Sequence, residues 1–289
     1  MKIGLYLMTK KGFEVLSYLI NKKCAESILF VCIGHDKNVE NDYSLETQNL
    51  CLENNLKFFL KGETNLPEAD FSIAISWRWI INVSNLIVLH DSILPKYRGF
   101  APLVNSLING EKVIGVSAIY ANAEYDKGDI ILQKTLAICY PIKIKDAIDK
   151  ISVLYSEIVY ELLENNNLKR FNSTKQVESE ATYSLWLDEE DYFINWEDNS
   201  ELIVRKINAC GFPYTGAKTK FENDIIRIDE AEVVQDLVIE NRVSGKHLFD
   251  ENEFPVIVCG FGLLKITKAY NISKDKNFFP VNKFRYRLK

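Results

Sequence analysis

The sequence predicts an α/β protein, in which a mostly parallel sheet with helices on both faces is followed by a small antiparallel β-barrel. Three observations lead to this expectation. At 289 residues, the chain is long for one domain and sufficient for two. Its first half alternates short apolar runs with segments of helical spacing, the pattern of a sheet with right-handed crossovers. Its second half instead contains short alternating runs separated by Gly, Asn and Asp.

The strands expected in the first half are rich in Ile and Val, as is typical of strands buried on both faces. They are KIGLYLM (2–8), SILFVCIG (27–34), FSIAIS (71–76), LIVLH (86–90) and GVSAIYA (115–121). Between them, apolar residues recur at three- and four-residue intervals in two segments. This spacing predicts helices over 13–23 and 44–55.

Later helices are indicated by their boundary residues. Pro102 suits the first turn of a short helix, which Asn109-Gly110 would end. A longer helix is expected from about Lys145 to Asn167. The polar segment 172–181 has the composition of a linker.

After that linker, the alternation of apolar runs and helical segments gives way to short alternating strands. A helix over 199–210 is followed by two stretches with short alternating strands, 211–234 and 254–270. We therefore expect two domains, 1–182 with the α/β sheet and 183–289 with the small barrel.

Composition and charge bear on whether the protein binds nucleic acid, contacts a membrane or holds a metal. The formal net charge of −5 gives no support to a nucleic-acid surface, which usually shows as a basic stripe. No signal peptide opens the chain, and no apolar run approaches the roughly 18 residues of a membrane span, so we expect a cytoplasmic protein without membrane contact. The six scattered cysteines form no C-x-x-C pair, and we expect them to be reduced, with no metal site.

His90 ends the predicted strand 86–90, and Asp126 follows the next predicted strand. Ligands of open α/β sheets bind beyond the carboxyl ends of the strands, so a histidine there suits chemistry. A turn that happens to contain a histidine is an equally good interpretation of His90 alone, and the D-x-G-D at Asp126 is ordinary turn chemistry. If the two side chains meet at one sheet edge, however, a carboxylate would orient an imidazole for proton transfer.

Three segments, HDSILPKYRG, FAPLVNSLINGE and GVSAIYANAEYDKGDIILQ, together resemble the folate-dependent formyltransferases. The shared pattern is H-x-S-[LI]-L-P-x-[YF]-x-G, followed 36 positions after its histidine by the aspartate of D-x-G-[DE]-I, which matches His90 and Asp126. Later segments (194–219 and 244–266) are similar to the carboxy-terminal domain of the larger members. The resemblance implies a Rossmann-like domain, an OB-like barrel, and formyl transfer from N10-formyltetrahydrofolate to an amine.

The resemblance also implies the roles of individual residues. His90 would stabilise the oxyanion and relay a proton to the leaving folate nitrogen, and Asp126 would orient His90 and help to accept the amine proton. Folate would lie against the turn 94–97 and the segment SWRWII (76–81), where Trp77 and Trp79 are instead compatible with a role as core aromatics. The expected folate-binding residues are Ser76, Trp77, Ser92, Leu94, Pro95, Lys96, Tyr97, Gly99 and Asp129.

Val88 departs from the family pattern, which has an asparagine two residues before the histidine. Valine donates no hydrogen bond, and loss of one oxyanion donor typically lowers the rate on the order of 10²–10³-fold. Three explanations remain. His90 alone carries the oxyanion, another side chain replaces the amide, or the protein is impaired and only binds folate or a nucleotide sugar.

The accepting amine is expected to belong to a nucleotide-linked amino sugar, such as a UDP- or dTDP-bound dideoxy-amino-hexose used for surface polysaccharide such as lipopolysaccharide O-antigen. Purine-pathway members have a glycine- and serine-rich phosphate loop where this chain has MTKKGF. Methionyl-tRNA is the alternative, but the segments 38–46 and 221–236 are acidic rather than basic. The resemblance also suggests a homodimer. The expected sugar-nucleotide residues are Trp186, Trp196, Arg205, Asn208 and Tyr214.

Overall fold

The computed structural model describes residues 1–164 and 172–289, which divide into two compact units. The first unit holds residues 1–103, 112–138 and 146–186, and the second holds 104–111, 139–145 and 187–289. The division into domains at residues 182 and 183 stays a prediction.

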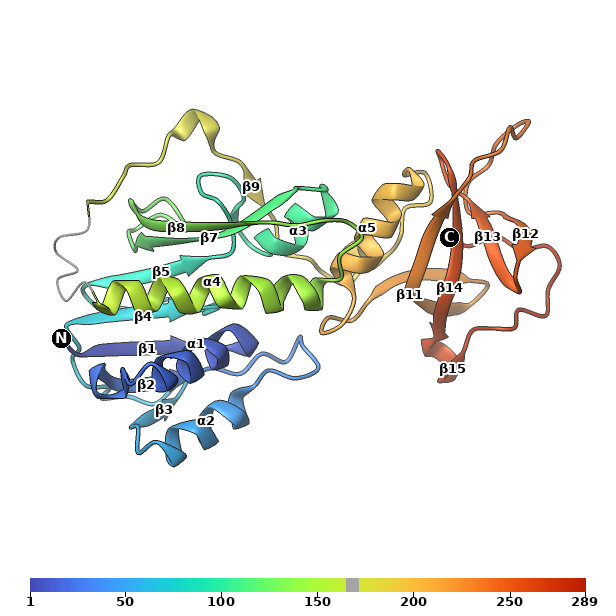
Figure 1. The fold of residues 1–289 in the computed structure, drawn as a ribbon. Helices are drawn as coiled ribbons and strands as arrows, with labels where there is room; N and C mark the ends of the chain where they lie inside the picture. Colours follow the sequence, from blue (N-terminus) through green and yellow to red (C-terminus); the bar gives the residue numbers. More distant parts are fainter. Residues whose placement is uncertain (165–171) are drawn as a thin grey trace. The chain divides into compact units, whose positions relative to one another are not determined.

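The first unit is built on a seven-stranded sheet with the order β3-β2-β1-β4-β5-β7-β8 (Figure 1). The five strands from β3 to β5 pair in parallel, whereas β7 is antiparallel to β5 and β8 is antiparallel to β7. The strands are β1 (Ile3–Leu7), β2 (Ile28–Ile33), β3 (Phe58–Leu60), β4 (Phe71–Ile75), β5 (Leu86–His90), β7 (Val113–Tyr120) and β8 (Ile130–Ala137). The predicted fold class is thus confirmed, although β3 and β8 were not expected.

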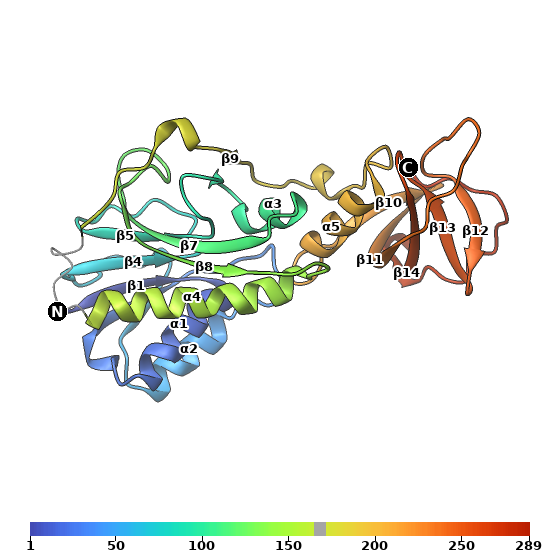
Figure 2. The same ribbon diagram turned by 45° about the horizontal axis from the view of Figure 1, so that its top comes forward.

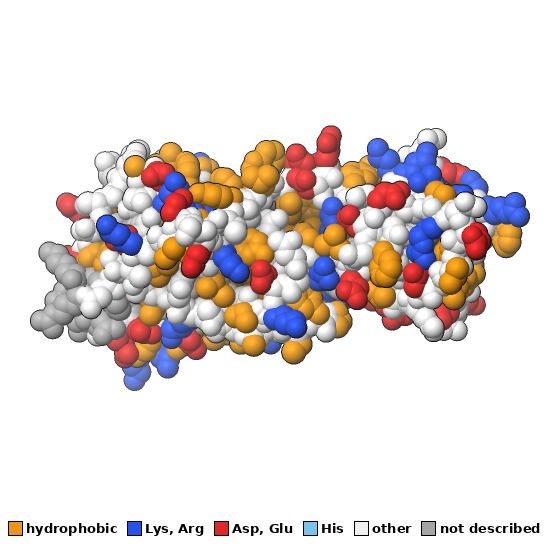
Figure 3. Space-filling model, turned by 90° about the horizontal axis from the view of Figure 1, so that it is seen from above, with side chains coloured by type: hydrophobic (Ala, Val, Ile, Leu, Met, Phe, Trp, Pro, Cys, Tyr) orange, Lys and Arg blue, Asp and Glu red, His pale blue; other side chains and the backbone are white. Residues whose placement is uncertain are grey.

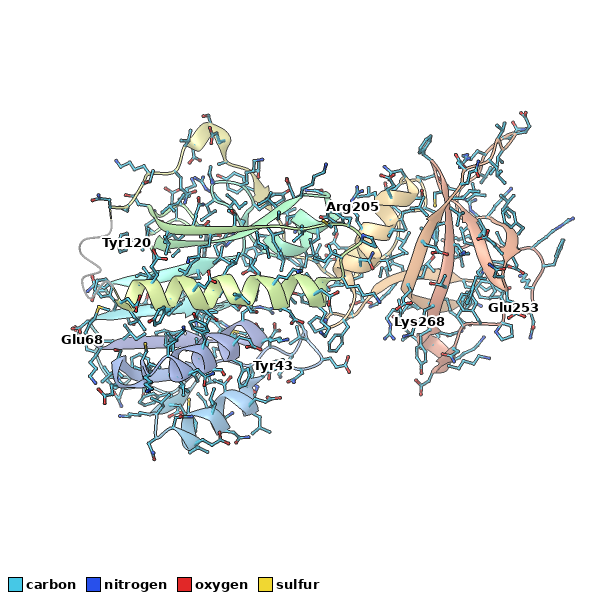
Figure 4. The ribbon with its side chains drawn as sticks, viewed as in Figure 1. Tyr43, Glu68, Tyr120, Arg205, Glu253 and Lys268 are labelled. Atoms are coloured by element: carbon cyan, nitrogen blue, oxygen red, sulfur yellow. The ribbon has the colours of Figure 1, made fainter. Side chains whose placement is uncertain are left out.

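The direction of β7 corrects one premise of the sequence interpretation. His90 pairs with Ser117 and Ile87 pairs with Tyr120, so β7 ends beside the beginning of β5. Figure 4 shows the labelled Tyr120 at the same edge of the sheet as Glu68, which precedes β4. Asp126 therefore does not follow a strand that ends at the edge where His90 lies.

The helices α1, α2 and α4 cover one face of the sheet, as Figure 2 shows, whereas helices on both faces were predicted. Their bounds are α1 (Thr9–Asn21), α2 (Ser44–Glu53) and α4 (Ile144–Glu164). The predicted extension of the last helix to Asn167 lies outside the described residues. No helix links β3 to β4 or β4 to β5, so on the other face extended segments cover an apolar cluster around Tyr6, Phe30, Cys32 and Ala74.

Residues 172–184, here called the strap, include the whole predicted linker (172–181) but are fixed to the first unit by hydrogen bonds. Thr174 and Ile130 exchange two backbone hydrogen bonds of 2.8 Å. At its other end, β9 (Tyr183–Ser184) pairs in parallel with β6 (Arg98–Gly99). In Figures 1 and 2 the strap, drawn in yellow, crosses the side of the sheet opposite the helices.

The second unit contains a six-stranded sheet. Five of its strands have the order β10-β11-β14-β13-β12, and the sixth, β15, pairs with β14. The final residues close this sheet, because Lys289 exchanges hydrogen bonds with Lys220 while Leu288 donates to the carbonyl of Gly245. This closure confirms the small antiparallel barrel. The helices of the second unit are α3 (Pro102–Ile108, which begins in the first unit) and α5 (Ser200–Cys210). Its strands are β10 (Ala217–Phe221), β11 (Asp224–Val234), β12 (His247–Glu251), β13 (Phe254–Val258), β14 (Leu263–Asn271) and β15 (Lys276–Asn277).

Two further properties bear on the sequence analysis. No helix within residues 1–164 and 172–289 is long and apolar enough to cross a membrane. The six cysteines are free thiols, and four of them are buried, as expected of small apolar side chains: Cys32, Cys51, Cys210 and Cys259.

Candidate active site

His90 lies at the end of β5, where its side chain is buried and both ring nitrogens face oxygen atoms. Nε2 lies 2.8 Å from the carbonyl oxygen of Tyr97. Because a carbonyl can only accept, Nε2 carries the hydrogen of this bond. Nδ1 faces the carboxylate of Asp126, with 3.5 Å between Nδ1 and Oδ1. The imidazole is therefore held at Nε2, and Nδ1 faces a carboxylate.

Asp126 is held against His90 by a backbone donor from another turn. Its Oδ2 accepts a 2.8 Å hydrogen bond from the N–H of Gly99. Gly99 has φ +102°, and a Cβ there would lie 2.6 Å from the carbonyl oxygen of Ser184, so this position requires glycine. Asp126 itself has φ +57°, a left-handed conformation that is uncommon for a residue with a side chain. The predicted meeting of His90 and Asp126 is what the structure shows.

The loop after β7 brings Asp126 to His90 by a different path from the one expected. Since β7 runs antiparallel to β5, the segment 121–129 must fold back along the sheet before β8 begins. Gly128 makes this return possible, because a Cβ there would collide with the carbonyl oxygen of Tyr120. The N–H of Tyr120 donates to the carbonyl of Asp129 at 3.1 Å, which ties the loop to the strand. Asp129 was predicted to bind folate, and in the structure its backbone carbonyl takes part in this contact within the loop.

The turn between His90 and Gly99 is held by its own polar groups. The Ser92 hydroxyl donates to the carbonyl of Lys96 at 2.6 Å. The N–H of Leu94 donates to Ser117 Oγ at 3.1 Å, and its carbonyl accepts from Gln133 Nε2 at 2.8 Å. Ser92 and Leu94 are therefore buried supports of the turn, whose exposed side chain is Lys96. The Leu94-Pro95 peptide bond is cis.

The segment after β4 presents polar atoms of another kind. Ser76 Oγ and Trp77 Nε1 are buried, and neither has a hydrogen-bond partner among the residues that the structure describes. Thr9 Oγ1, at the adjacent end of β1, is also buried and has no hydrogen-bond partner among those residues. Ser76 and Thr9 both have positive φ values, of 54° and 58°. We call these three residues the Ser76 corner. Ser76 and Trp77 were predicted from the sequence, whereas Thr9 was not, because it lies in no recognisable motif.

Val88 stands in an apolar environment. It pairs with Ala74 on β4 and Ile119 on β7, and its side chain packs against the cluster that contains Tyr6 and Cys32. Trp77 packs against the same cluster. The place of the family asparagine is thus occupied by a residue that matches its surroundings.

A largely buried ion pair is formed by Asp91, the residue that follows His90. The Asp91 carboxylate forms an ion pair with Lys11 and accepts a hydrogen bond from the Tyr155 hydroxyl. Burial raises the pKa of Asp91, but the Lys11 ammonium and the hydrogen bonds from Lys11 and Tyr155 outweigh it, so the pKa lies below its usual range. This pair anchors the start of the turn to α1 and α4.

The predicted sugar-nucleotide residues are spread over both units. Trp186 belongs to the first unit and is 61% exposed. Tyr183 and Leu185, which precede it closely in the chain, are also exposed. Figure 3 shows that apolar side chains (orange) reach the surface at many places on the face drawn there. In the second unit, Trp196 is buried and its Nε1–H donates to Thr219 Oγ1 at 2.9 Å, so it serves the core of that unit.

The other predicted residues of the second unit lie on α5 or just after it. Arg205, labelled in Figure 4, donates from Nε to the carbonyl of Ile108 at 2.8 Å. Asn208 and Tyr214 are half-buried. The predicted sugar-nucleotide set is therefore not brought together as one cluster within either unit.

A mixed α/β sheet with a histidine–carboxylate pair, joined to a small antiparallel barrel, defines a two-unit protein with a site suited to proton transfer. The chain belongs to the formyl transferase family. Residues 69–163 match the formyl transferase model, and residues 187–277 match the model of the formyl transferase C-terminal domain. Both His90 and Asp126 lie within the first match.

Individual relatives agree with this assignment. A methionyl-tRNA formyltransferase of Caldanaerobacter subterraneus subsp. tengcongensis is 31% identical over 180 residues, which are 62% of this chain and 57% of that protein. The match thus spans little more than half the length of that relative.

Solved structures show the same fold over the length of both chains. WlaRD, a sugar 3N-formyl transferase solved in the presence of dTDP and 5-N-formyl-THF, has a TM-score of 0.66 at 19% identity and covers 97% of this chain and 99% of its own. An N-formyltransferase from Helicobacter canadensis, in complex with folinic acid and dTDP-3-aminofucose, has a TM-score of 0.68 at 18% identity, covering 93% and 100%.

Proposed function

We propose that the protein transfers the formyl group of N10-formyltetrahydrofolate to the amino group of a nucleotide-linked amino sugar. The observation that carries this proposal is the pairing of His90 Nδ1 with Asp126 Oδ1 at 3.5 Å, inside the segment that matches the formyl transferase model. Surface polysaccharide biosynthesis is the process in which such a product would be used.

The proposed reaction moves one carbon and one proton. The amine nitrogen forms a bond to the formyl carbon, the bond between that carbon and N10 breaks, the amine loses a proton and N10 gains one. Charge develops as an oxyanion and an ammonium, which the site must stabilise and neutralise. We assign His90 to the oxyanion and to the proton that N10 receives, and Asp126 to orienting His90 and helping to accept the amine proton.

The hydrogen bonds of His90 indicate which ring nitrogen acts. Nε2–H is engaged with the Tyr97 carbonyl, so both the oxyanion contact and the proton exchange assigned to His90 fall to Nδ1. The 3.5 Å between Nδ1 and Asp126 Oδ1 exceeds a normal hydrogen-bond length. Catalytic contacts of this kind often shorten when substrate is bound.

The Ser76 corner fits a pterin. A pterin ring has several N–H, N and C=O groups around its edge, which need partners once they leave water. Ser76 Oγ and Trp77 Nε1 are buried and have no partner among the described residues, so they are available to such groups. The family resemblance implies that folate lies against the turn 94–97 and the segment 76–81, which includes Ser76 and Trp77. The cosubstrate supplies the activated one-carbon group.

A sugar acceptor is favoured over tRNA by two observations. The sugar N-formyltransferase structures match this chain over nearly their full length and include the second unit. The net charge of −5 also gives little support to a protein that must neutralise many phosphates. The sequence relatives are methionyl-tRNA formyltransferases, which keeps that activity as the second candidate.

The test is a panel assay with purified protein and N10-formyltetrahydrofolate. UDP- and dTDP-linked sugars with the amino group at C3 or C4 are offered in parallel with methionyl-tRNA, and released tetrahydrofolate and formylated product are quantified. We expect turnover with at least one amino sugar. Turnover with methionyl-tRNA alone would replace the proposal by the second candidate. Ligand binding without release of tetrahydrofolate would identify a non-catalytic binding protein.

A further inference from the structure

The strap contacts the groups that hold His90 and Asp126 in place. The Thr182 hydroxyl accepts a 2.9 Å hydrogen bond from the N–H of Tyr97, whose carbonyl in turn accepts from His90. The carbonyl of Ser184 accepts from the N–H of Phe100 at 3.0 Å, next to the Gly99 N–H that binds Asp126. The turn that supports the catalytic pair is therefore fixed by a segment more than 80 residues later in the chain.

Gln176 extends this support to the Asp126 loop. Its Nε2 donates to the carbonyl of Asp126 at 2.7 Å and to the carbonyl of Gly128 at 2.8 Å. One side-chain amide thus holds both ends of the segment 126–128, whose first residue presents the carboxylate. Its two N–H groups are both used, one for each carbonyl.

Arg98 sets the orientation of that amide. Its Nε donates to Gln176 Oε1 at 3.0 Å, and because a guanidinium only donates, the oxygen of the amide must face Arg98. The Arg98 side chain is 1% exposed, and its Nη1 donates to both carboxylate oxygens of Glu178, at 3.0 and 2.8 Å. The guanidinium is thereby fixed by the strap itself, and the nitrogen of Gln176 is directed at the Asp126 loop.

We propose that Gln176 is a positioning residue for the formyl transfer, acting through Asp126. By clamping the carbonyls of Asp126 and Gly128, it sets the separation between the Asp126 carboxylate and His90 Nδ1. This inference rests on the proposed function for its kinetic consequence. Its structural consequence, the placement of the carboxylate on Gly99 N–H, is independent of the substrate.

The test compares three variants of the full chain. Gln176→Ala removes the clamp, and Gln176→Glu keeps the acceptor for Arg98 but places a carboxylate oxygen against two carbonyls. Lys175→Ala is the matched control, because Lys175 is an exposed neighbour in the strap. The kinetic readout is kcat and KM with N10-formyltetrahydrofolate and the amino sugar that wild type formylates. The spectroscopic readout is the amide proton shift of Gly99 in a deuterated, ¹⁵N-labelled sample.

We expect kcat to fall by about tenfold to a hundredfold in both Gln176 variants, because a misplacement on the order of 1 Å has effects of this size. KM for the formyl donor and the melting temperature should stay near those of Lys175→Ala. The Gly99 amide proton should lie downfield in wild type and move upfield in the Gln176 variants, since its bond to a carboxylate is weakened.

Different failures have different meanings. An unchanged Gly99 resonance in both Gln176 variants overturns the positioning role, whether or not turnover is seen. A loss of kcat that is matched by a fall in melting temperature reduces Gln176 to a structural residue. Absence of turnover in wild type, with the Gly99 shift behaving as expected, overturns the proposed function and leaves the clamp standing.

Discussion

Two neighbouring regions of the first unit treat their buried polar groups in opposite ways. The His90–Asp126 pair itself has partners: the imidazole pairs with the Tyr97 carbonyl and the Asp126 carboxylate with the Gly99 N–H, although Arg98 Nη2 nearby has no partner among the described residues. At the Ser76 corner, the Ser76 hydroxyl and the Trp77 indole N–H are buried without a partner within the described residues.

This difference separates a rigid site from a binding surface. Paired groups are preorganised, so they need little rearrangement when charge develops in a reaction. Unpaired buried polar groups each cost about 1–3 kcal/mol, a cost that hydrogen bonds to a bound molecule would offset. The His90 region should therefore determine the rate of the reaction, and the Ser76 corner should determine the affinity for the formyl donor.

The sharpest test of the rigid site is removal of either member of the pair. We expect His90→Ala and Asp126→Ala to lower kcat on the order of 10²–10⁴-fold, because each removes a proton-transfer group. The unfolding temperature should change little. A small decrease in Asp126→Ala would follow from loss of the hydrogen bond between the Gly99 N–H and the Asp126 carboxylate. Near-normal kcat in either variant, measured by tetrahydrofolate release, would remove that residue from the mechanism.

The meeting of His90 and Asp126 was predictable from sequence, but the route by which they meet was not. A strand run such as 115–121 carries no mark of its direction, and β7 proved to be antiparallel. The clamp by Gln176 is a contact across 50 positions between a polar segment and a loop, and neither periodicity nor turn residues reveal such a pairing. Arg98, a charged residue in a turn, gave no sequence sign that it would be buried.

The ion pair of Asp91 offers a test of what fixes the start of the rigid turn. Asp91→Asn leaves the Lys11 ammonium without its counter-charge, and we expect a loss of about 3 kcal/mol in the free energy of unfolding at neutral pH. Asp149→Asn is the control, since its pair with Lys10 is much more exposed and should contribute about 1 kcal/mol or less. Denaturant unfolding measures both, and equal losses would show that burial of the Asp91 pair is unimportant.

The same pair predicts a pH dependence. The folded-state pKa of Asp91 lies below its unfolded value, so its contribution to stability is present above the unfolded pKa, at about 4. That contribution is lost as the pH falls through the folded-state pKa. Wild type should therefore lose more stability than Asp91→Asn on acidification below about pH 4.

Val88 tests whether the rigid site can be returned to the family pattern by one substitution. Val88→Asn places an amide against an apolar cluster, which should cost about 1–3 kcal/mol of stability and fail to raise kcat. Val88→Ala, which removes volume without adding a polar group, is the control for packing. A tenfold gain in kcat for Val88→Asn would mean that valine only removes the hydrogen-bond donor of the family asparagine, and that the rest of the site has not adapted to valine.

The smallest expected effect concerns two tryptophans that differ in one hydrogen bond. Trp77 Nε1 is unpaired among the described residues, whereas Trp196 Nε1 donates to Thr219. Replacement by Phe removes the N–H and similar volume from each. Trp196→Phe should cost about 1 kcal/mol more stability than Trp77→Phe, because it breaks an existing bond.

Trp77→Phe should instead raise KM for the formyl donor by a few-fold to about tenfold, the equivalent of one lost hydrogen bond, while kcat stays close to wild type. Trp196→Phe should leave KM unchanged. The inverse pattern, in which Trp77→Phe lowers kcat and leaves KM unchanged, would place the indole N–H with the reacting atoms. It would then be the donor that replaces the family asparagine, and the Ser76 corner would belong to the same rigid site as His90.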